Sequence, residues 1–152
     1  MKGLSEQERL IWSAGIFDGE GCINISRNRK AGAYSRLMII VVMRELEPIM
    51  MLQSLFPGSW VNIVHRKNRN GHYHRWTMSG RKAADALIRW FPYLVVKRDQ
   101  AQKGIDFQDH VDEWKPQVTG SRSLPDKIKT YRNEVAKEMS AMKRAFSCSC
   151  ND

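Results

Sequence analysis

The spacing of hydrophobic and polar positions predicts a helix at the start of the chain, over residues 5–21. Ser5 and Glu8 form a capping box, in which each side chain bonds the other residue's backbone N–H, directly ahead of an apolar pair. We expect the helix to end at Gly21, with this glycine in the left-handed conformation that often stops helices.

The following segments repeat one order, a pair of strands and then a helix. Alternating polarity and β-branched residues predict the strands, Asn70-Gly71 is a strong hairpin signal, and Pro48 suits the first turn of a helix. The expected strands are 22–28, 34–43, 59–67 and 72–79; the expected helices are 48–56, 80–91, the later part of 93–111, and 126–146; residues 115–125 are expected to form a loop.

This order, α-ββ-α-ββ-α with additional C-terminal helices, predicts the α+β class. Two hairpins with helices between them favour one antiparallel, saddle-like sheet with helices on one face and the other face open. A chain of 152 residues suits a single domain, with a core at about 5–112 and a helical extension at about 113–147.

The charge of the chain favours a polyanionic partner. Lys and Arg number 25 against 16 Asp and Glu, a net charge of +9, which points to nucleic acid or an anionic membrane surface. We expect no transmembrane helix and no secretory signal, because no long apolar run is present. The three cysteines, Cys22, Cys148 and Cys150, lack a disulfide framework spacing and suggest a reduced, intracellular protein.

The open sheet face carries the candidate DNA contacts. Trp76 and Met78 are expected in the core, as are Val61 and Ile63, which leaves alternate positions outward. Asn, Ser, Thr and Arg supply the donors and acceptors that read base edges in a major groove. The candidates are Asn24, Ser26, Asn28, Lys30, Asn62, Arg66, Tyr73, Arg75 and Thr77; the alternative is an ordinary solvated face.

The second strand departs from this pattern, because both of its faces are largely apolar. It offers few hydrogen bonds to bases, although apolar contacts to thymine methyl groups stay open to it.

The stretch "SAGIFDGEG" contains features that disfavour a helix. Gly15 and Gly19 each cost about 1 kcal/mol relative to alanine, and Asp18 and Glu20 lie at the negative end of the helix dipole. Glycines one turn apart allow two helix backbones to approach closely. If the partner is the same helix of a second subunit, the acids converge near a two-fold axis, where Mg²⁺ would relieve their repulsion.

This stretch resembles the signature helix of the LAGLIDADG homing endonucleases, with Ala14, Gly15, Asp18 and Gly21 in matching positions. The later segments "HYHRWTMSGRKAADALI" and "FPYLVVKRDQA" are also similar, so the resemblance covers about residues 8–112. It implies a homodimer that cuts both strands of a long, pseudo-palindromic DNA site across the minor groove, with a divalent metal ion, in an intron-related setting.

The resemblance also implies roles for particular residues. Glu20 matches the metal-binding acid, joined by Gly19; Lys97 matches a basic residue near the scissile phosphate; Arg44 falls near a polar residue of the water network. Mg²⁺ is the expected cofactor, with Mn²⁺ or Ca²⁺ as substitutes, Ca²⁺ without catalysis. The implied dimer interface contains Ile11, Gly15, Asp18 and Gly19, with Asp18 structural and not a metal ligand.

Two other functions stay open. A non-cutting binder on the same scaffold, an intron maturase or a transcription regulator, needs neither Glu20 nor Lys97, and a basic scaffold protein leaves the glycines and acids unexplained. His72 and His74 share a strand face, but without a third ligand at a recognisable spacing we interpret them as surface or DNA-backbone residues. The protein is expected where its target DNA lies: microbial or phage-infected cytoplasm, or an organelle.

Overall fold

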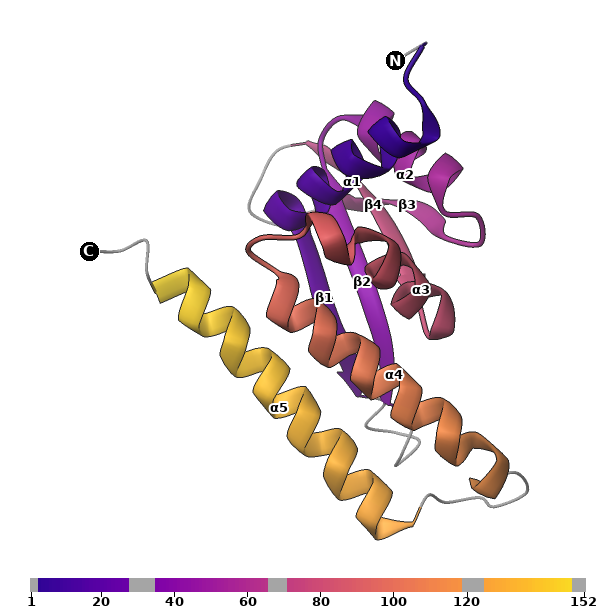
Figure 1. Cartoon of the computed structure of the whole chain (residues 1–152). Helices are drawn as coiled ribbons and strands as arrows, with labels where there is room; N and C mark the ends of the chain where they lie inside the picture. Colours follow the sequence, from indigo (N-terminus) through magenta and orange to yellow (C-terminus); the bar gives the residue numbers. More distant parts are fainter. Residues whose placement is uncertain (1–2, 28–34, 66–70, 119–124, 149–152) are drawn as a thin grey trace.

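The computed structural model describes residues 3–27, 35–65, 71–118 and 125–148. It confirms the expected α+β order within these ranges (Figure 1). The elements are α1 (Glu6–Glu20), β1 (Gly21–Arg27), β2 (Ser35–Met43), α2 (Leu46–Leu55), β3 (Trp60–His65), β4 (His72–Ser79), α3 (Arg81–Trp90), a 3-10 turn (Phe91–Tyr93), α4 (Arg98–Val118) and α5 (Asp126–Cys148). No helix in these ranges is long and apolar enough to cross a bilayer.

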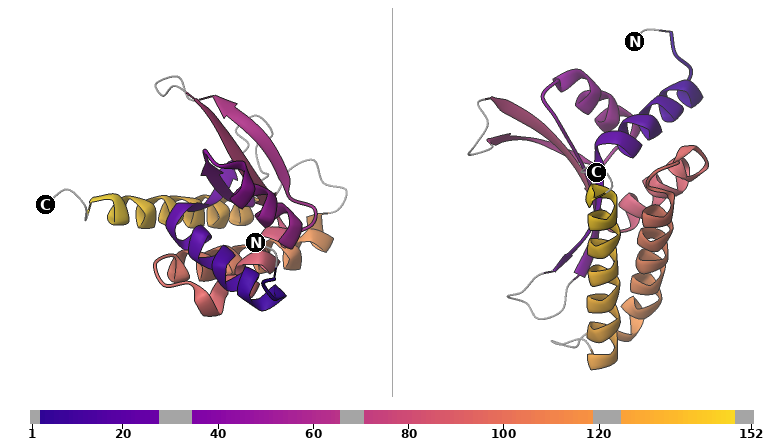
Figure 2. Two further views of the ribbon diagram at one scale, coloured as in Figure 1. Left: turned by 90° about the horizontal axis from the view of Figure 1, so that it is seen from above. Right: turned by 90° about the vertical axis from the view of Figure 1, so that its left-hand side faces the viewer.

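The strands form one antiparallel sheet in the order β1-β2-β4-β3. The described helices lie on one side of this twisted sheet, and the β3–β4 hairpin projects beyond them (Figure 2). Leu37, Ile39 and Val41 of β2 point to the helical side and are fully buried. Side chains alternate along a strand, so their neighbours Met38, Ile40 and Val42 belong to the other side.

Helix α1 begins as its sequence predicts and ends differently. Both halves of the capping box form, with the Ser5 N–H 2.8 Å from the Glu8 carboxylate and the Glu8 N–H 3.2 Å from Ser5 Oγ. The left-handed conformation expected at Gly21 is wrong, because its φ of −74° and ψ of 156° are extended. Glycine is needed there for space: a Cβ would collide with the carbonyl oxygen and ring of Phe17.

Aromatic rings fill the centre of the core. Phe17 of α1 stacks on Trp90 of α3 at 4.4 Å between ring centroids, and Phe56 meets Trp90 edge-on at 4.7 Å. The Trp90 indole N–H donates to Ser13 Oγ at 2.8 Å, so the one polar atom of this fully buried ring has a partner. α1 is thereby fixed against α3 by both packing and a buried hydrogen bond.

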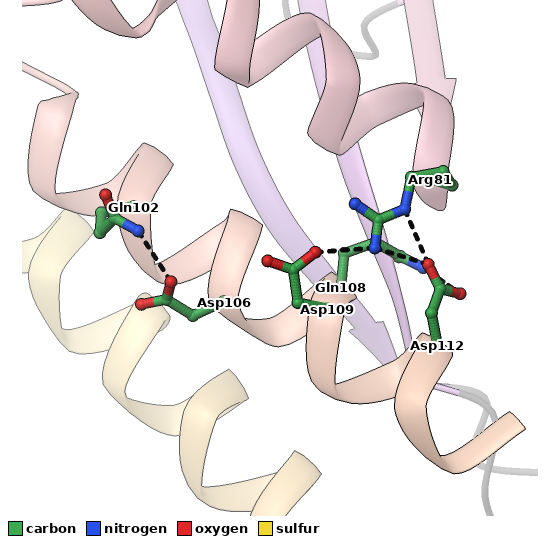
Figure 3. Close-up of polar contacts among 6 residues, drawn as sticks. All are labelled: Arg81, Gln102, Asp106, Gln108, Asp109 and Asp112. Atoms are coloured by element: carbon green, nitrogen blue, oxygen red, sulfur yellow. Dashed lines mark hydrogen bonds and ion pairs between the residues drawn. The ribbon is translucent and has the colours of Figure 1, made fainter.

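Arg81, the first residue of α3, holds α4 against α3 (Figure 3). Its guanidinium lies 2.7 Å from a carboxylate oxygen of Asp109 and 2.6 Å from one of Asp112. Hydrogen bonds from Arg81 to these carboxylates raise the pKa of the guanidinium. Arg81 is 28 residues from Asp109 and 31 from Asp112 in the sequence, so only the folded chain reveals the contact.

The loop expected at 115–125 is wrong in its first part, because α4 continues to Val118. Pro116 lies in the last turn of α4, where its missing N–H removes only one helical hydrogen bond. Residues 119–124 lie outside the described ranges. α5 packs along α4 and the edge strand β1 (Figure 1), with the Lys103 ammonium bonded to Glu138.

Candidate functional site

The C-terminal end of α1 meets the segment that leads into α4. The Lys97 ammonium donates to the backbone carbonyl oxygen of Asp18 and, at 3.4 Å, to that of Gly19. The last turn of α1 has no basic residue of its own. Lys97 therefore supplies, from far along the sequence, the positive charge that a helix C-terminus favours.

Asp18 makes the reciprocal contact. Its carboxylate accepts hydrogen bonds from the backbone N–H groups of Val95, Val96 and Lys97 at 3.0, 2.9 and 2.8 Å. Burial by itself would raise the pKa of Asp18, but these bonds and the Lys97 charge outweigh it and hold the pKa below its ordinary value. An acid that looks misplaced at the end of α1 thus lies at the N-terminus of α4, where negative charge is stabilised.

Glu20, the last residue of α1, lies within electrostatic range of the Lys97 ammonium. Burial lowers the pKa of the Lys97 ammonium, and the neighbouring Asp18, Cys22 and Glu20 partly oppose that shift. Glu20 itself is exposed, and no hydrogen bond fixes its carboxylate within the described residues. The junction therefore combines an accessible carboxylate with a positioned cation.

The donors at this junction fit a hard divalent ion only in part. Mg²⁺ is commonly bound through one or two carboxylates, with phosphate and water completing its shell. Glu20 supplies one carboxylate and Gly19 a carbonyl oxygen, which Lys97 already approaches. Among the described residues, no group of three or more His, Cys, Asp or Glu side chains could hold a metal. A divalent ion held at this junction would therefore need further oxygen ligands from outside these residues.

Arg44 has its guanidinium 5.9 Å from the centre of the Tyr73 ring. A Cβ at Gly71, where φ is +133°, would lie 2.9 Å from the Arg44 guanidinium, so the arginine also covers the start of β4. The register pairs Gly21 of β1 with Val41 of β2, so Arg44 follows β2 at the same end of the sheet as Glu20, with its guanidinium on the β4 side. Its proposed part in the water network stays a prediction.

The exposed face of α1 contains the residues expected at a dimer interface. Ile11 is 44% exposed, and a Cβ at Gly15 or Gly19 would meet nothing within 4 Å. Sequence reasoning missed Val95 and Val96, which are 83% and 48% exposed and are held beside α1 by Asp18. The apolar pair "VV" just before Lys97 was the available signal.

The side of the sheet without helices is named the open face. The register brings side chains from all four strands together on it in rows. It comprises Cys22, Asn24, Ser26, Arg36, Met38, Ile40, Val42, Trp60, Asn62, Val64, Tyr73, Arg75, Thr77 and Ser79. Of the candidate DNA contacts, Asn28, Lys30 and Arg66 lie outside the described residues.

Exposure on the open face differs from expectation at one position. Asn62 is exposed, and Asn24, Ser26, Tyr73 and Arg75 are half-buried. Thr77 was expected to be outward and available, but it is only 6% exposed. Its register neighbours are Ile40 and Trp60, whose larger side chains flank it and reduce its exposure.

Two further differences concern β3 and the edge of the sheet. Ile63 was expected in the core, but it is 57% exposed in β3, where its register partner is His74 of β4. Sequence reasoning also missed Trp60, 53% exposed on the open face, and the contact between Lys143 Nζ of α5 and Cys22 Sγ at 3.3 Å. No local pattern predicts either.

Comparison with solved structures decides the fold. The structure of the homing endonuclease I-CvuI, in complex with its target in the presence of calcium, matches 90% of this chain and 83% of its own, with a TM-score of 0.65 and 21% identity. The chain has the LAGLIDADG homing-endonuclease fold. An archaeal intron-encoded homing endonuclease complexed with DNA matches over 91% of this chain and 86% of its own, with a TM-score of 0.68 and 13% identity.

The homing-endonuclease fold extends over almost the whole chain. The homing endonuclease I-TnaI matches 95% of this chain and 97% of its own, with a TM-score of 0.60 and 20% identity. No protein-family model and no curated protein matches the sequence. The relationship is therefore visible in the arrangement of helices and strands and not in overall sequence identity.

Proposed function

We propose that the chain is a sequence-specific DNA endonuclease that acts as a homodimer and cuts both strands of a long, pseudo-palindromic site with the help of Mg²⁺. The observation that carries the proposal is the junction at the end of α1, where the Lys97 ammonium binds the carbonyl oxygens of Asp18 and Gly19, directly before exposed Glu20. The homing-endonuclease fold and the polar open face of the sheet support it. The full 152 residues would act as one unit.

In this proposal each residue of the junction has a separate role. Glu20 holds the metal ion with the Gly19 carbonyl, and a bound Mg²⁺ would stabilise charge on the scissile phosphate. Lys97 places a positive charge where negative charge develops on the phosphate oxygens. Asp18 is a positioning residue, because its bonds to the backbone of 95–97 fix the origin of the Lys97 side chain.

Dimerisation through α1 would complete the site. The exposed strip of Ile11, Gly15 and Gly19 has room for a second backbone, and Val95 borders it. A two-fold axis along this strip brings two Glu20 carboxylates together, one for each DNA strand. The partner copy thus supplies the oxygen ligands that one protomer lacks.

The decisive test is cleavage of the DNA that flanks the gene, in buffer containing Mg²⁺. We expect double-strand breaks at one site from the native protein. Glu20→Gln should abolish cutting and leave binding in Ca²⁺ intact, whereas Glu134→Gln, which removes an exposed charge on α5, should cut normally. Tight binding without cleavage in Mg²⁺ or Mn²⁺ would instead favour the maturase or the regulator.

The open face is tested separately by binding. Arg75→Gln should weaken affinity for the target, while Lys82→Gln, which removes a charge from α3 on the helical side, should not. Affinity should also fall steeply with salt, because phosphate contacts release counterions. Equal losses for the two variants would show that only overall charge matters. The protein would act in the compartment that holds its target DNA.

A further inference from the structure

Two histidines face each other across the far end of the β3–β4 hairpin. His65 and His72 are partners in the antiparallel register, and both are exposed. Their ring centroids are 4.8 Å apart, with the rings at 77° to each other. We infer that this pair binds a divalent transition-metal ion such as Zn²⁺, separately from the junction at Glu20.

The ring separation fits two imidazoles on one ion. A zinc–nitrogen bond of about 2.1 Å places the ion about 3.2 Å from each ring centre, since the lone pair points radially from the ring. Bond angles at the ion between 90° and 110° then require centroids about 4.6–5.3 Å apart. The observed 4.8 Å falls inside this interval, so the rings need only rotate toward a common point.

The surroundings also suit an exchangeable ion. Among the residues that the structure describes, the neighbouring pair on the same side of the hairpin is Ile63 with His74, and neither carries a carboxylate or a fixed positive charge. Tyr73, whose ring the Arg44 guanidinium approaches, lies on the opposite, open face. Among the described residues no third His, Cys, Asp or Glu joins the pair, so water would have to fill the other coordination positions.

The chemistry of the pair selects the ion. Imidazole suits Zn²⁺, Ni²⁺ and Cu²⁺, whereas Mg²⁺ prefers oxygen ligands and does not compete. The pair lies on the helical side of the sheet but beyond the helices, so DNA on the open face would leave it accessible (Figure 2). A bound ion would join β3 to β4 at the end of the hairpin. This inference does not depend on the proposed nuclease activity.

Calorimetric titration of the full chain with ZnCl₂ in excess Mg²⁺ tests the inference. The hairpin backbone holds the two histidines near each other, so an ion bound to one gains the other as a ligand that is already in place. His65→Asn and His72→Asn each remove that gain and should each weaken zinc affinity about a hundredfold. His74 belongs to the next register pair on the same face, and His74→Asn should bind zinc with the affinity of the native chain. Circular dichroism without zinc checks that each variant is folded, which is expected for these exposed positions.

The cysteines are the competing zinc ligands. The titrations are repeated with Cys22, Cys148 and Cys150 changed to Ser, and the zinc site should persist. The inference is overturned if the chain with these three cysteine substitutions and both histidines intact binds no zinc. It is equally overturned if the His65→Asn/His72→Asn double variant binds as tightly as the native chain, or if His74→Asn loses as much affinity as His65→Asn.

Discussion

Replacing Gly15 with leucine should strengthen the protomer while it disrupts the assembly. Gly15 lies in the middle of α1, and a Cβ there would meet nothing within 4 Å. Leucine has a helix propensity close to that of alanine, so Gly15→Leu should raise the free energy of unfolding of the separate protomer by about 0.6–1 kcal/mol. For a chain of this size that corresponds to about 2–4 °C in Tm.

The opposite effect is expected on the dimer. Close approach of two α1 helices depends on small residues at the contact, and a leucine at Gly15 would push the two backbones apart. Sedimentation velocity over a range of concentrations should find Gly15→Leu monomeric where the native chain is dimeric. Cleavage should be lost with dimerisation, although Glu20 and Lys97 are untouched. Unfolding is then compared at concentrations where both proteins are monomers.

Gly21 provides a control of opposite sign. A Cβ at Gly21 would collide with Phe17, so Gly21→Ala should destabilise the protomer itself. A native-like dimer that cuts DNA with Gly15→Leu would refute the α1 interface. A less stable Gly15→Leu monomer would refute the conclusion that the position is open in the protomer.

Three further predictions concern stability and pH. Ser13→Ala leaves the buried Trp90 indole N–H without its acceptor and should cost about 1–3 kcal/mol in urea unfolding. Asp18→Asn removes the negative charge and one of the two oxygens that accept the 95–97 N–H groups. Because the pKa of Asp18 is lowered in the fold, its contribution to stability is present above the unfolded carboxyl pKa of about 3.8 and is lost as the pH falls through the folded value. The unfolding free energy of the variant should therefore vary less with pH in acid. Burial lowers the pKa of His110 from 6.5, so the native protein should lose stability as pH falls below that value, and His110→Gln should lose less.

Local patterns were sufficient for much of the fold. The capping box at Ser5 and Glu8 gave the start of α1, and the alternation over 72–79 gave the bounds of β4. These features depend on residues within a few positions of each other. The α-ββ-α-ββ-α order followed from such segments and is confirmed.

Contacts between segments that are distant in the sequence could not be predicted from local patterns. The hydrogen bonds of Asp18 with residues 95–97 join positions almost eighty residues apart, and no pattern in "SAGIFDGEG" predicts them. Thr77 lies on the expected face, but its burial depends on the neighbour that β3 supplies, Trp60. The extent of α4 past Pro116 was missed because proline usually marks a helix end.

The reciprocal contacts between the end of α1 and the segment before α4 link the proposed assembly to the proposed chemistry. Asp18 fixes the backbone of Val95 and Val96, which border the α1 strip, and also the backbone of Lys97, which lies within electrostatic range of Glu20. The same α1 turn therefore places the apolar residues of the interface and the charged residues of the junction. In the proposed dimer, a shift of α1 against the second α1 would therefore move both sets together.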